Sequence, residues 1–384
     1  MEKHAKRILL IAGEASGDHH GAHVVKALKH IDPSIHVYGI GGEELRKEGM
    51  EILYSSEELA VVGILEVFSH VTHIIKAFHT IKKEILKTPP SLVLLLDYPD
   101  FNLRIANIAK KKNVPVLYYI SPQIWAWRKG RAKKIIQLVD KMAVIFPFEI
   151  PFYAHEEFAV EFVGHPLLDQ DWNLIDTQSA LKNFHLKEGH WPIIGLLPGS
   201  RKSEIDRLLP PMLASIPCII KKYPDAQFAL PCAPGIRQDY IKSLVDKYNV
   251  QVSIISDNFK QVVSICDLVL VASGTATLET AIMEKQMIIL YKVSLLTYLI
   301  GKMLISIPYI GLTNIVAGKK VVPELIQGEV TPSRIVEEVT TILDNPDQMH
   351  TMKMELSAIK KKLGNKGASR RVAQLACEMM SSSV

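Results

Sequence analysis

Short apolar runs alternate with helical stretches along almost the whole chain, and this alternation constrains the fold more than any other feature. Runs such as residues 91–97 and 115–120 are apolar enough to be central strands covered on both faces. The predicted strands lie at residues 7–13, 36–42, 91–97, 115–120, 140–146, 192–199, 226–232, 250–255, 267–273 and 286–291. Strands that alternate with helices are typical of parallel α/β sheets, so the chain is predicted to be an α/β protein.

The predicted strands form two series, separated by a polar segment, and 384 residues are about right for two domains. We expect an N-terminal Rossmann-like domain over residues 1–168 and a polar linker over 169–191. A second Rossmann-like domain is expected over 192–345, and C-terminal helices over 346–384 that can pack back on the first domain. Because ligands of open parallel sheets bind beyond the carboxyl ends of the strands, we expect a binding cleft between the two domains.

Composition and charge argue against several classes of function. The net charge of +5 favours anionic partners, but a nucleic-acid-binding domain is usually more basic. The four cysteines are scattered, and no metal or cofactor is expected. The most apolar region, residues 287–316, is interrupted by Lys292, Lys302 and Pro308, so we expect an interfacial helix at 294–305 and no bilayer span. A cytoplasmic protein that touches membranes is predicted.

Two strand-to-helix turns in the second half of the chain are suited to an anion. At residues 199–201, backbone amides, the helix dipole and an arginine fork fit a diphosphate. At residues 273–275, amides and hydroxyls meet another helix start, and an acid follows one turn later for ribose hydroxyls. Each turn alone also fits an ordinary helix start. Together they predict a nucleotide diphosphate site formed by Gly199, Ser200, Arg201, Ser273, Gly274, Thr275 and Glu279.

Acidic residues occupy the same kind of turn in the first half. Glu14, Ser16 and Asp18 follow the first strand, where they suit a sugar, although Ser16 or Asp18 could simply cap the next helix. The GxGxxG fingerprint is absent from this turn, which argues against a nicotinamide cofactor. Asp97 ends a central strand and is either a turn residue or a general base for a sugar hydroxyl.

Two further segments are candidates for contact with substrate or lipid. Residues 121–135 carry two tryptophans, which suit a sugar platform or an interfacial anchor. A basic cluster follows them, and it could bind a substrate phosphate, contact a membrane surface or belong to a solvated helix. Residues 59–87 have more apolar side chains at helical spacing than one core-facing stripe requires, which leaves some for acyl chains or a bilayer. The candidates in these segments are Trp125, Trp127, Arg128, Arg131, Val67 and Phe68.

Together these segments resemble the lipid-A-disaccharide synthase family of glycosyltransferases. The resemblance covers nearly the whole chain and rests on GEASGD, ELAVVGILEV, DYPDFN, SPQIWAWR, LLPGSR, ASGTATLE and TNIVAGKKVVPELIQ, which occur in the family order. It implies the GT-B fold, in which two Rossmann-like domains with parallel sheets face each other across a cleft.

The resemblance also implies a reaction. UDP-2,3-diacylglucosamine and 2,3-diacylglucosamine 1-phosphate would give a β-1,6-linked disaccharide 1-phosphate and UDP, with inversion at the anomeric centre. Asp97 would be the base, Glu14 and Asn314 would join it in the catalytic site, and Ser16 and Asp18 would lie on the acceptor side. The two turns of the second half would hold UDP. The enzyme would associate peripherally with the anionic inner face of the inner membrane, and a homodimer is left open.

Two positions depart from the family pattern, and two other functions stay open. Tyr98 stands where a small residue is common, and residues 311–313 are Gly-Leu-Thr where Ser-Leu-Pro is frequent, so the cleft could differ in shape. Another GT-B enzyme, such as a UDP-GlcNAc 2-epimerase or a lipid-II-forming transferase, would share the UDP site without an acylated acceptor. A non-catalytic nucleotide- or lipid-binding protein would tolerate the loss of Asp97.

Overall fold

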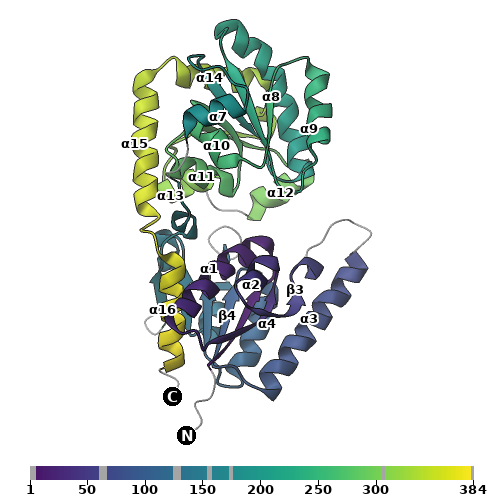
Figure 1. Ribbon diagram of the computed structural model, residues 1–384, viewed down its shortest axis with the longest axis vertical. Coiled ribbons are helices and arrows are strands. Elements are labelled where there is room, and N and C mark those ends of the chain that lie inside the picture. The colour runs from purple at the N-terminus through teal and green to yellow at the C-terminus, as the bar shows by residue number, and fades with distance from the viewer. Residues whose placement is uncertain are drawn as a thin grey trace. The chain divides into compact units, whose positions relative to one another are not determined.

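The computed structural model describes residues 6–59, 67–123, 131–153, 158–172, 176–304 and 308–381. The chain divides into two compact units (Figure 1). Unit 1 comprises Met1–Asp169 and Leu363–Val384, and unit 2 comprises Gln170–Lys362. Unit 1 therefore contains both ends of the chain.

Unit 1 is built on a seven-stranded sheet. Its strands are β1 (Arg7–Ala12), β2 (His36–Gly41), β3 (Glu51–Ser55), β4 (Leu92–Leu96), β5 (Val116–Tyr119), β6 (Lys141–Val144) and β7 (Ala159–Phe162). They pair in parallel in the order β3-β2-β1-β4-β5-β6-β7. The strand order reverses between β1 and β4, and such a switch point is where open parallel sheets bind ligands.

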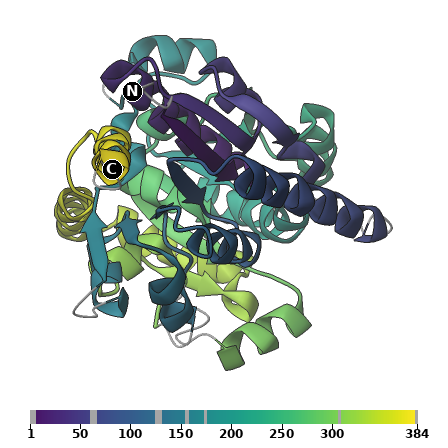
Figure 2. The ribbon, with the colours of Figure 1, turned by 90° about the horizontal axis from the view of Figure 1, so that it is seen from below.

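Helices cover both faces of this sheet. They are α1 (Ala15–Ile31), α2 (Glu43–Lys47), α3 (Val67–Lys87), α4 (Pro99–Lys110), α6 (Arg131–Leu138) and α16 (Ala368–Ser381), with the 3-10 helices η1 (Glu57–Leu59), η3 (Pro147–Tyr153) and η4 (Pro166–Asp169). Helix α1 contacts α2 and α16, whereas α4 contacts α3 and α6, and α3 runs beside β3 (Figure 2). Right-handed crossovers that leave the switch point in opposite directions place these two groups on opposite faces.

Unit 2 repeats the strand order of unit 1. Its strands are β8 (Ile193–Leu197), β9 (Gln227–Cys232), β10 (Ser253–Ser256), β11 (Leu268–Ala272), β12 (Gln286–Tyr291) and β13 (Glu324–Ile326). The order β10-β9-β8-β11-β12-β13 is again parallel, with its switch point between β8 and β11. Two parallel-sheet α/β domains were predicted, and the structure confirms them.

The helices of unit 2 are α7 (Thr177–Asn183), α8 (Lys202–Lys222), α9 (Gln238–Val245), α10 (Phe259–Ile265), α11 (Thr275–Ile282), α12 (Leu295–Leu304), α13 (Leu312–Ala317), α14 (Pro332–Leu343) and α15 (Pro346–Lys362), with η5 (Asp246–Tyr248) and η6 (Gln327–Glu329). Most of these helices lie between the strands in the chain, whereas α7 precedes β8 and both α14 and α15 follow β13. Among the described residues, no helix is long and apolar enough to cross a membrane.

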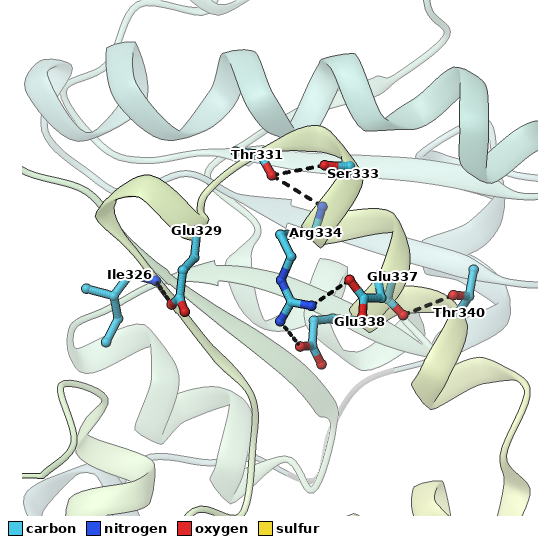
Figure 3. Close-up of polar contacts among 8 residues, drawn as sticks. All are labelled: Ile326, Glu329, Thr331, Ser333, Arg334, Glu337, Glu338 and Thr340. Carbon is cyan, nitrogen blue, oxygen red and sulfur yellow. Dashed lines mark hydrogen bonds and ion pairs between the residues drawn. The ribbon is translucent and has the colours of Figure 1, made fainter.

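The start of α14 shows how local sequence sets a helix boundary. Thr331 caps the helix by accepting a hydrogen bond from the Arg334 amide at 3.3 Å, and Pro332 occupies the first turn, where a missing amide hydrogen costs nothing. The Arg334 guanidinium then reaches Glu337 at 2.5 Å and Glu338 at 2.9 Å (Figure 3). These partly exposed pairs fix the side chains more than they stabilise the fold.

The segment expected to be a linker folds as part of unit 2, which corrects the expected boundary. Asp176 caps α7 by accepting hydrogen bonds from the amides of Gln178 and Ser179, and α7 packs on α10. Further along, the Lys187 amide donates to the Gln227 side chain at 2.7 Å. Polar composition alone predicts a linker here, but these polar groups are capping and bridging residues of a folded segment.

The two C-terminal helices belong to different units. Helix α15 contacts α11, α13 and α14 and belongs to unit 2, whereas α16 packs on α1 in unit 1 (Figure 1). Asp169 holds the start of α16, because its carboxylate accepts hydrogen bonds from the amides of Gly367 at 2.6 Å, Ala368 at 3.1 Å and Ser369 at 3.0 Å. The chain thus returns to unit 1 immediately after α15.

Candidate functional site

The turns after β1 and β4 meet at the switch point of unit 1. Gly13 follows β1, and a Cβ placed on it would lie 2.6 Å from Cδ1 of the Tyr98 ring. Only glycine at position 13 therefore lets Tyr98 approach so closely. Glu14 follows Gly13 and Asp97 precedes Tyr98, so both predicted carboxylates stand at the same edge of the sheet.

The backbone of the turn after β4 is strained. Asp97 and Tyr98 have φ angles of 47° and 44°, a left-handed conformation that costs a non-glycine residue about 1–3 kcal/mol. Two buried side chains hold it. Nδ2 of Asn102 donates to the carbonyl oxygens of Leu96 at 3.0 Å and Asp97 at 2.6 Å, and the Tyr118 hydroxyl donates to the Asp97 carbonyl at 2.5 Å. The side-chain direction of Asp97 is thus set by the tertiary structure.

Burial tunes the titration of this turn. It raises the pKa of Asp97, and a hydrogen bond from the Tyr98 backbone opposes the shift. Burial also raises the pKa of the Tyr98 hydroxyl, and the nearby Glu14 carboxylate adds to that effect. A carboxylate with a raised pKa is a stronger proton acceptor, which suits Asp97 to general-base chemistry.

Asp18 serves the fold at this edge. Its carboxylate, 7 % exposed, accepts hydrogen bonds from the amides of Gly42 at 2.6 Å, Glu44 at 3.0 Å and Leu45 at 3.3 Å. It therefore caps α2, a helix more than twenty residues further along the chain. The acceptor contact expected of Asp18 stays a prediction beside this capping role. Ser16 lies exposed in the first turn of α1.

Unit 2 contains a pocket of about 830 Å³ beyond the carboxyl ends of β8, β9 and β11. All seven residues predicted to bind the nucleotide line it: Gly199, Ser200, Arg201, Ser273, Gly274, Thr275 and Glu279. The turns after β8 and β11 adjoin because these two strands pair across the switch point. The structure therefore brings both anion-receptive turns into one cavity.

An acidic side chain of the chain itself occupies the first of these turns. The Glu204 carboxylate accepts hydrogen bonds from the amides of Ser200 at 3.1 Å and Arg201 at 3.3 Å, and from the Arg201 guanidinium at 3.1 Å. Gly199, with φ of +112°, leaves room for it, since a Cβ there would lie 2.3 Å from the carboxylate. The amides were expected to be free, but a helix start attracts any carboxylate within reach.

The second turn is open. Gly274 begins α11, and a Cβ added to it would meet nothing within 4 Å. Thr275 is exposed, while the Ser273 hydroxyl donates to the Ile310 carbonyl at 3.1 Å. A ligand can therefore approach the backbone of Gly274 closely, as a phosphate at a helix start requires.

The sequence reasoning missed the opposite wall of the pocket. This wall is formed by residues 231–234 at the end of β9 and residues 257–261 after β10, and it includes Phe259. The ammonium group of Lys260 lies 4.4 Å from the centre of the Trp172 ring. The rule that ligands bind beyond strand ends applies to these turns as well, so the signal was present at Pro234-Gly235 and Asn258-Phe259.

Asn314 is committed to the fold of unit 2. It is fully buried, and its Nδ2 donates to the Val322 carbonyl at 2.9 Å and to Glu324 at 2.8 Å. Its Oδ1 accepts from the amides of Val321 at 2.7 Å and Val322 at 3.0 Å. Both ends of the amide are thus bonded within the protein, and the catalytic role expected of Asn314 stays a prediction.

The remaining predicted residues cannot be placed as side chains. Trp125, Trp127 and Arg128 lie outside the described residues. Val67, Phe68 and Arg131 belong to the backbone of α3 and α6, but their side chains also lie outside the described part. Within the ranges that the structure describes, no group of three or more His, Cys, Asp or Glu residues could hold a metal ion.

Comparison with known proteins gives a consistent result. A family model described as lipid-A-disaccharide synthetase matches residues 8–379. Lipid-A-disaccharide synthase of Geobacter sulfurreducens is 46% identical over 383 residues, covering 100% of both chains. That of Syntrophus aciditrophicus is 46% identical over 380 residues, covering 99% of each.

Solved structures share the fold at low sequence identity. A putative UDP-N-acetylglucosamine 2-epimerase from Listeria monocytogenes has a TM-score of 0.64 at 12% identity, over 96% of this chain and 94% of that one. A glycosyltransferase of kitacinnamycin has a TM-score of 0.63 at 11% identity, over 98% and 99%. These neighbours indicate the GT-B architecture and nothing finer.

Proposed function

Because the chain belongs to the lipid-A-disaccharide synthase family, we propose that it transfers 2,3-diacylglucosamine from UDP-2,3-diacylglucosamine to 2,3-diacylglucosamine 1-phosphate. The products would be a β-1,6-linked disaccharide 1-phosphate and UDP. Membership of the family makes the protein a glycosyltransferase of lipid A biosynthesis. An epimerase is not favoured, because the likeness to epimerases extends to the fold alone.

The pocket of unit 2 is the proposed UDP site. The diphosphate would lie against the starts of α8 and α11, where it takes the place of the Glu204 carboxylate on the amides of Ser200 and Arg201. Glu279 would accept bonds from the ribose hydroxyls, and the wall that includes Phe259 leaves room for the base. Negative charge that develops on departing UDP would be stabilised by Arg201 and both helix starts.

Asp97 is the proposed base, and its place on a strained, half-buried turn at the switch point, with a raised pKa, is the observation that carries the mechanism. The carboxylate would take the proton from the acceptor hydroxyl as the oxygen attacks the anomeric carbon. The bond to UDP breaks in the same displacement, so the configuration inverts and no covalent enzyme intermediate forms. Glu14 and Tyr98 would orient the acceptor sugar beside Asp97, with Ser16 within reach on α1.

Contact with a bilayer would supply both lipid substrates. Trp125, Trp127, Arg128, Arg131, Val67 and Phe68 remain the proposed contacts to the acceptor or the membrane. An anionic inner-membrane surface fits their basic and aromatic character. The enzyme would then act as a peripheral protein on the inner face of that membrane.

The proposal is tested by UDP release from purified protein given both lipids in detergent. We expect release only when both lipids are present, and a fall of about 10²- to 10⁴-fold in Asp97→Ala, as expected for loss of a general base. Asp347→Ala, an exposed acid in the first turn of α15, is the matched control and should keep full activity. Release with a non-acylated acceptor would instead favour another GT-B transferase.

A further inference from the structure

Unit 1 has a cavity of about 650 Å³ that is lined by residues of α3, α4 and α6 and by Lys111 and Lys112, which follow α4. Each of these helices follows the carboxyl end of a strand and runs back along the sheet. The lining begins only at Phe78 in α3, Leu103 in α4 and Lys134 in α6, so the cavity lies along these helices and not at the edge that carries Glu14 and Asp97. We call this cavity the basic groove.

The basic groove takes its name from its rim, which carries five cations. They are Lys82, Arg104, Lys111, Lys112 and Lys134. Not one of the residues that line the groove is acidic, and within the described ranges none of the five cations forms an ion pair. Their neighbour Lys110 does pair, with Asp140 at 2.7 Å. Five like charges that face one cavity without a carboxylate create a positive potential that attracts an anion.

The floor of the basic groove is apolar. Phe78 and Leu86 of α3, Leu103 and Ile108 of α4, and Leu138 of α6 contribute to it. The Leu86 residue is 44% exposed, which is high for a large apolar residue, and Ile75 on the same helix is 49% exposed. An apolar floor beneath a cationic rim matches an anionic amphiphile, with its acyl or glycerol part on the floor and its phosphate at the rim.

We propose that the basic groove binds anionic phospholipid and docks the outer helical face of unit 1 on a bilayer. The inference rests on the membrane-associated function proposed above and adds a specific lipid site to it. Only Lys134 among the rim residues belongs to the basic cluster discussed from the sequence. An acidic protein segment would satisfy the rim, but it would leave the exposed apolar floor uncovered. A phospholipid covers both.

The test measures co-sedimentation of the full-length protein with vesicles of phosphatidylcholine alone or mixed with phosphatidylglycerol. We expect binding to the mixed vesicles that weakens as salt is raised. Reversal of two rim charges in Arg104→Glu/Lys111→Glu should weaken it by at least about 20-fold, since each cation near an anionic surface contributes about fivefold. Unchanged binding by this variant would overturn the proposal.

A matched control separates the effect of the basic groove from the effects of net charge and of folding. Lys26→Glu/Lys47→Glu makes the same change of charge at two exposed lysines of α1 and α2, on the opposite face, and should bind vesicles nearly as the wild type does. An equal loss in this control would mean that only net charge matters and would overturn the groove. UDP binding by unit 2 should be the same in both variants, which checks that they are folded.

Two further outcomes separate the groove from the proposed reaction. Leu86→Ser should reduce the vesicle binding that persists at high salt, because it removes exposed apolar surface from the floor. The variant Arg104→Glu/Lys111→Glu should turn over both lipid substrates in detergent at the wild-type rate. If the wild-type protein shows no transferase activity, the proposed function fails, but the vesicle-binding result still tests the basic groove. Charge-dependent binding of polyglutamate without binding to mixed vesicles would overturn the phospholipid in favour of an acidic protein partner.

Discussion

At the switch point of unit 1 the turn after β4 presents a carboxylate, Asp97, whereas the equivalent turn of unit 2, after β11, presents the open backbone of Gly274 and the exposed Thr275 at the start of α11. The two sheets share their strand order up to the last strand, so topology places both turns in the same way. Their chemistry is nevertheless opposite, because the residues of the turn decide whether it offers a proton acceptor or hydrogen-bond donors. Under the proposed function, one topology would supply both the base and the UDP site.

The two units also hold their turns in opposite ways. In unit 1 the buried donors Asn102 and Tyr118 hold a strained backbone so that an acid projects from it. In unit 2 an acid, Glu204, covers the donors at the start of α8. We infer that the first site is ready before substrate arrives, whereas the second exchanges the Glu204 carboxylate for the phosphate of the ligand.

The largest effect is expected at the acid of unit 1. Asp97→Asn keeps the shape of the side chain but removes the base, so turnover should fall by about 10²- to 10⁴-fold. UDP affinity should not change, because the proposed UDP site lies in unit 2. Single-turnover kinetics and calorimetric UDP titration measure the two quantities. A parallel loss of UDP affinity would break the division of roles between the units.

The pH dependence of the wild type sharpens the same point. A base must be deprotonated, so kcat/KM should rise as pH increases through the raised pKa of Asp97. The stability of the fold changes in the opposite direction. The pKa of Asp97 is higher in the folded than in the unfolded protein, so this group favours folding at pH values below the ordinary pKa of an aspartate. That contribution is lost as pH rises through the raised pKa of the folded protein. Asp97→Asn should therefore flatten both profiles in that window. Denaturant unfolding at several pH values, beside the rate profile, checks the sign.

A smaller effect is expected at the cation of unit 2. Arg201→Ala should weaken UDP binding by about 10- to 100-fold, the range for a charge-assisted hydrogen bond to an anion. The acid limb of the pH–rate profile should stay in place, since Asp97 is untouched. Arg237→Ala, an exposed arginine outside the lining of the pocket, is the control. Wild-type UDP affinity in Arg201→Ala would remove this guanidinium from the site.

The strained turn of unit 1 can be relaxed without touching the acid. Asn102→Ala removes two hydrogen bonds from a fully buried side chain and should cost about 1–3 kcal/mol of unfolding free energy. Turnover should fall more than UDP affinity, because Asp97 loses its fixed direction. Asn107→Ala, exposed on the same helix, should change neither. A stable Asn102→Ala protein with normal turnover would show that the turn keeps its conformation unaided.

The smallest effect is expected where unit 2 covers its own donors. Glu204→Gln removes a negative charge from the start of α8, so UDP should bind about two- to fivefold more tightly, in line with charge effects at a helix terminus. Isothermal titration at low ionic strength resolves a change of this size. Weaker UDP binding by Glu204→Gln would contradict the exchange of the Glu204 carboxylate for phosphate. It would mean that Glu204 orients the amides for the ligand.

Much of the fold could be predicted because strands buried on both faces leave a local signal. Nine of the ten predicted runs contain an observed strand, and the tenth, 250–255, overlaps β10. The three missed strands, β3, β7 and β13, lie at edges of their sheets, where a strand needs fewer apolar residues and the run is less distinct. The turns at the strand ends were equally readable, and all seven residues predicted for the nucleotide site line one pocket.

The sequence by itself determined the two sheets, the turns that carry polar residues and the family, because periodicity and motifs are local properties. Only the tertiary structure decided which of those polar side chains are free to meet a ligand. Asp18 caps a helix about two dozen residues away, and Asn314 is saturated by a loop that follows it. A polar group near a site binds the nearest donor of suitable geometry, and whether that donor belongs to the protein depends on folding.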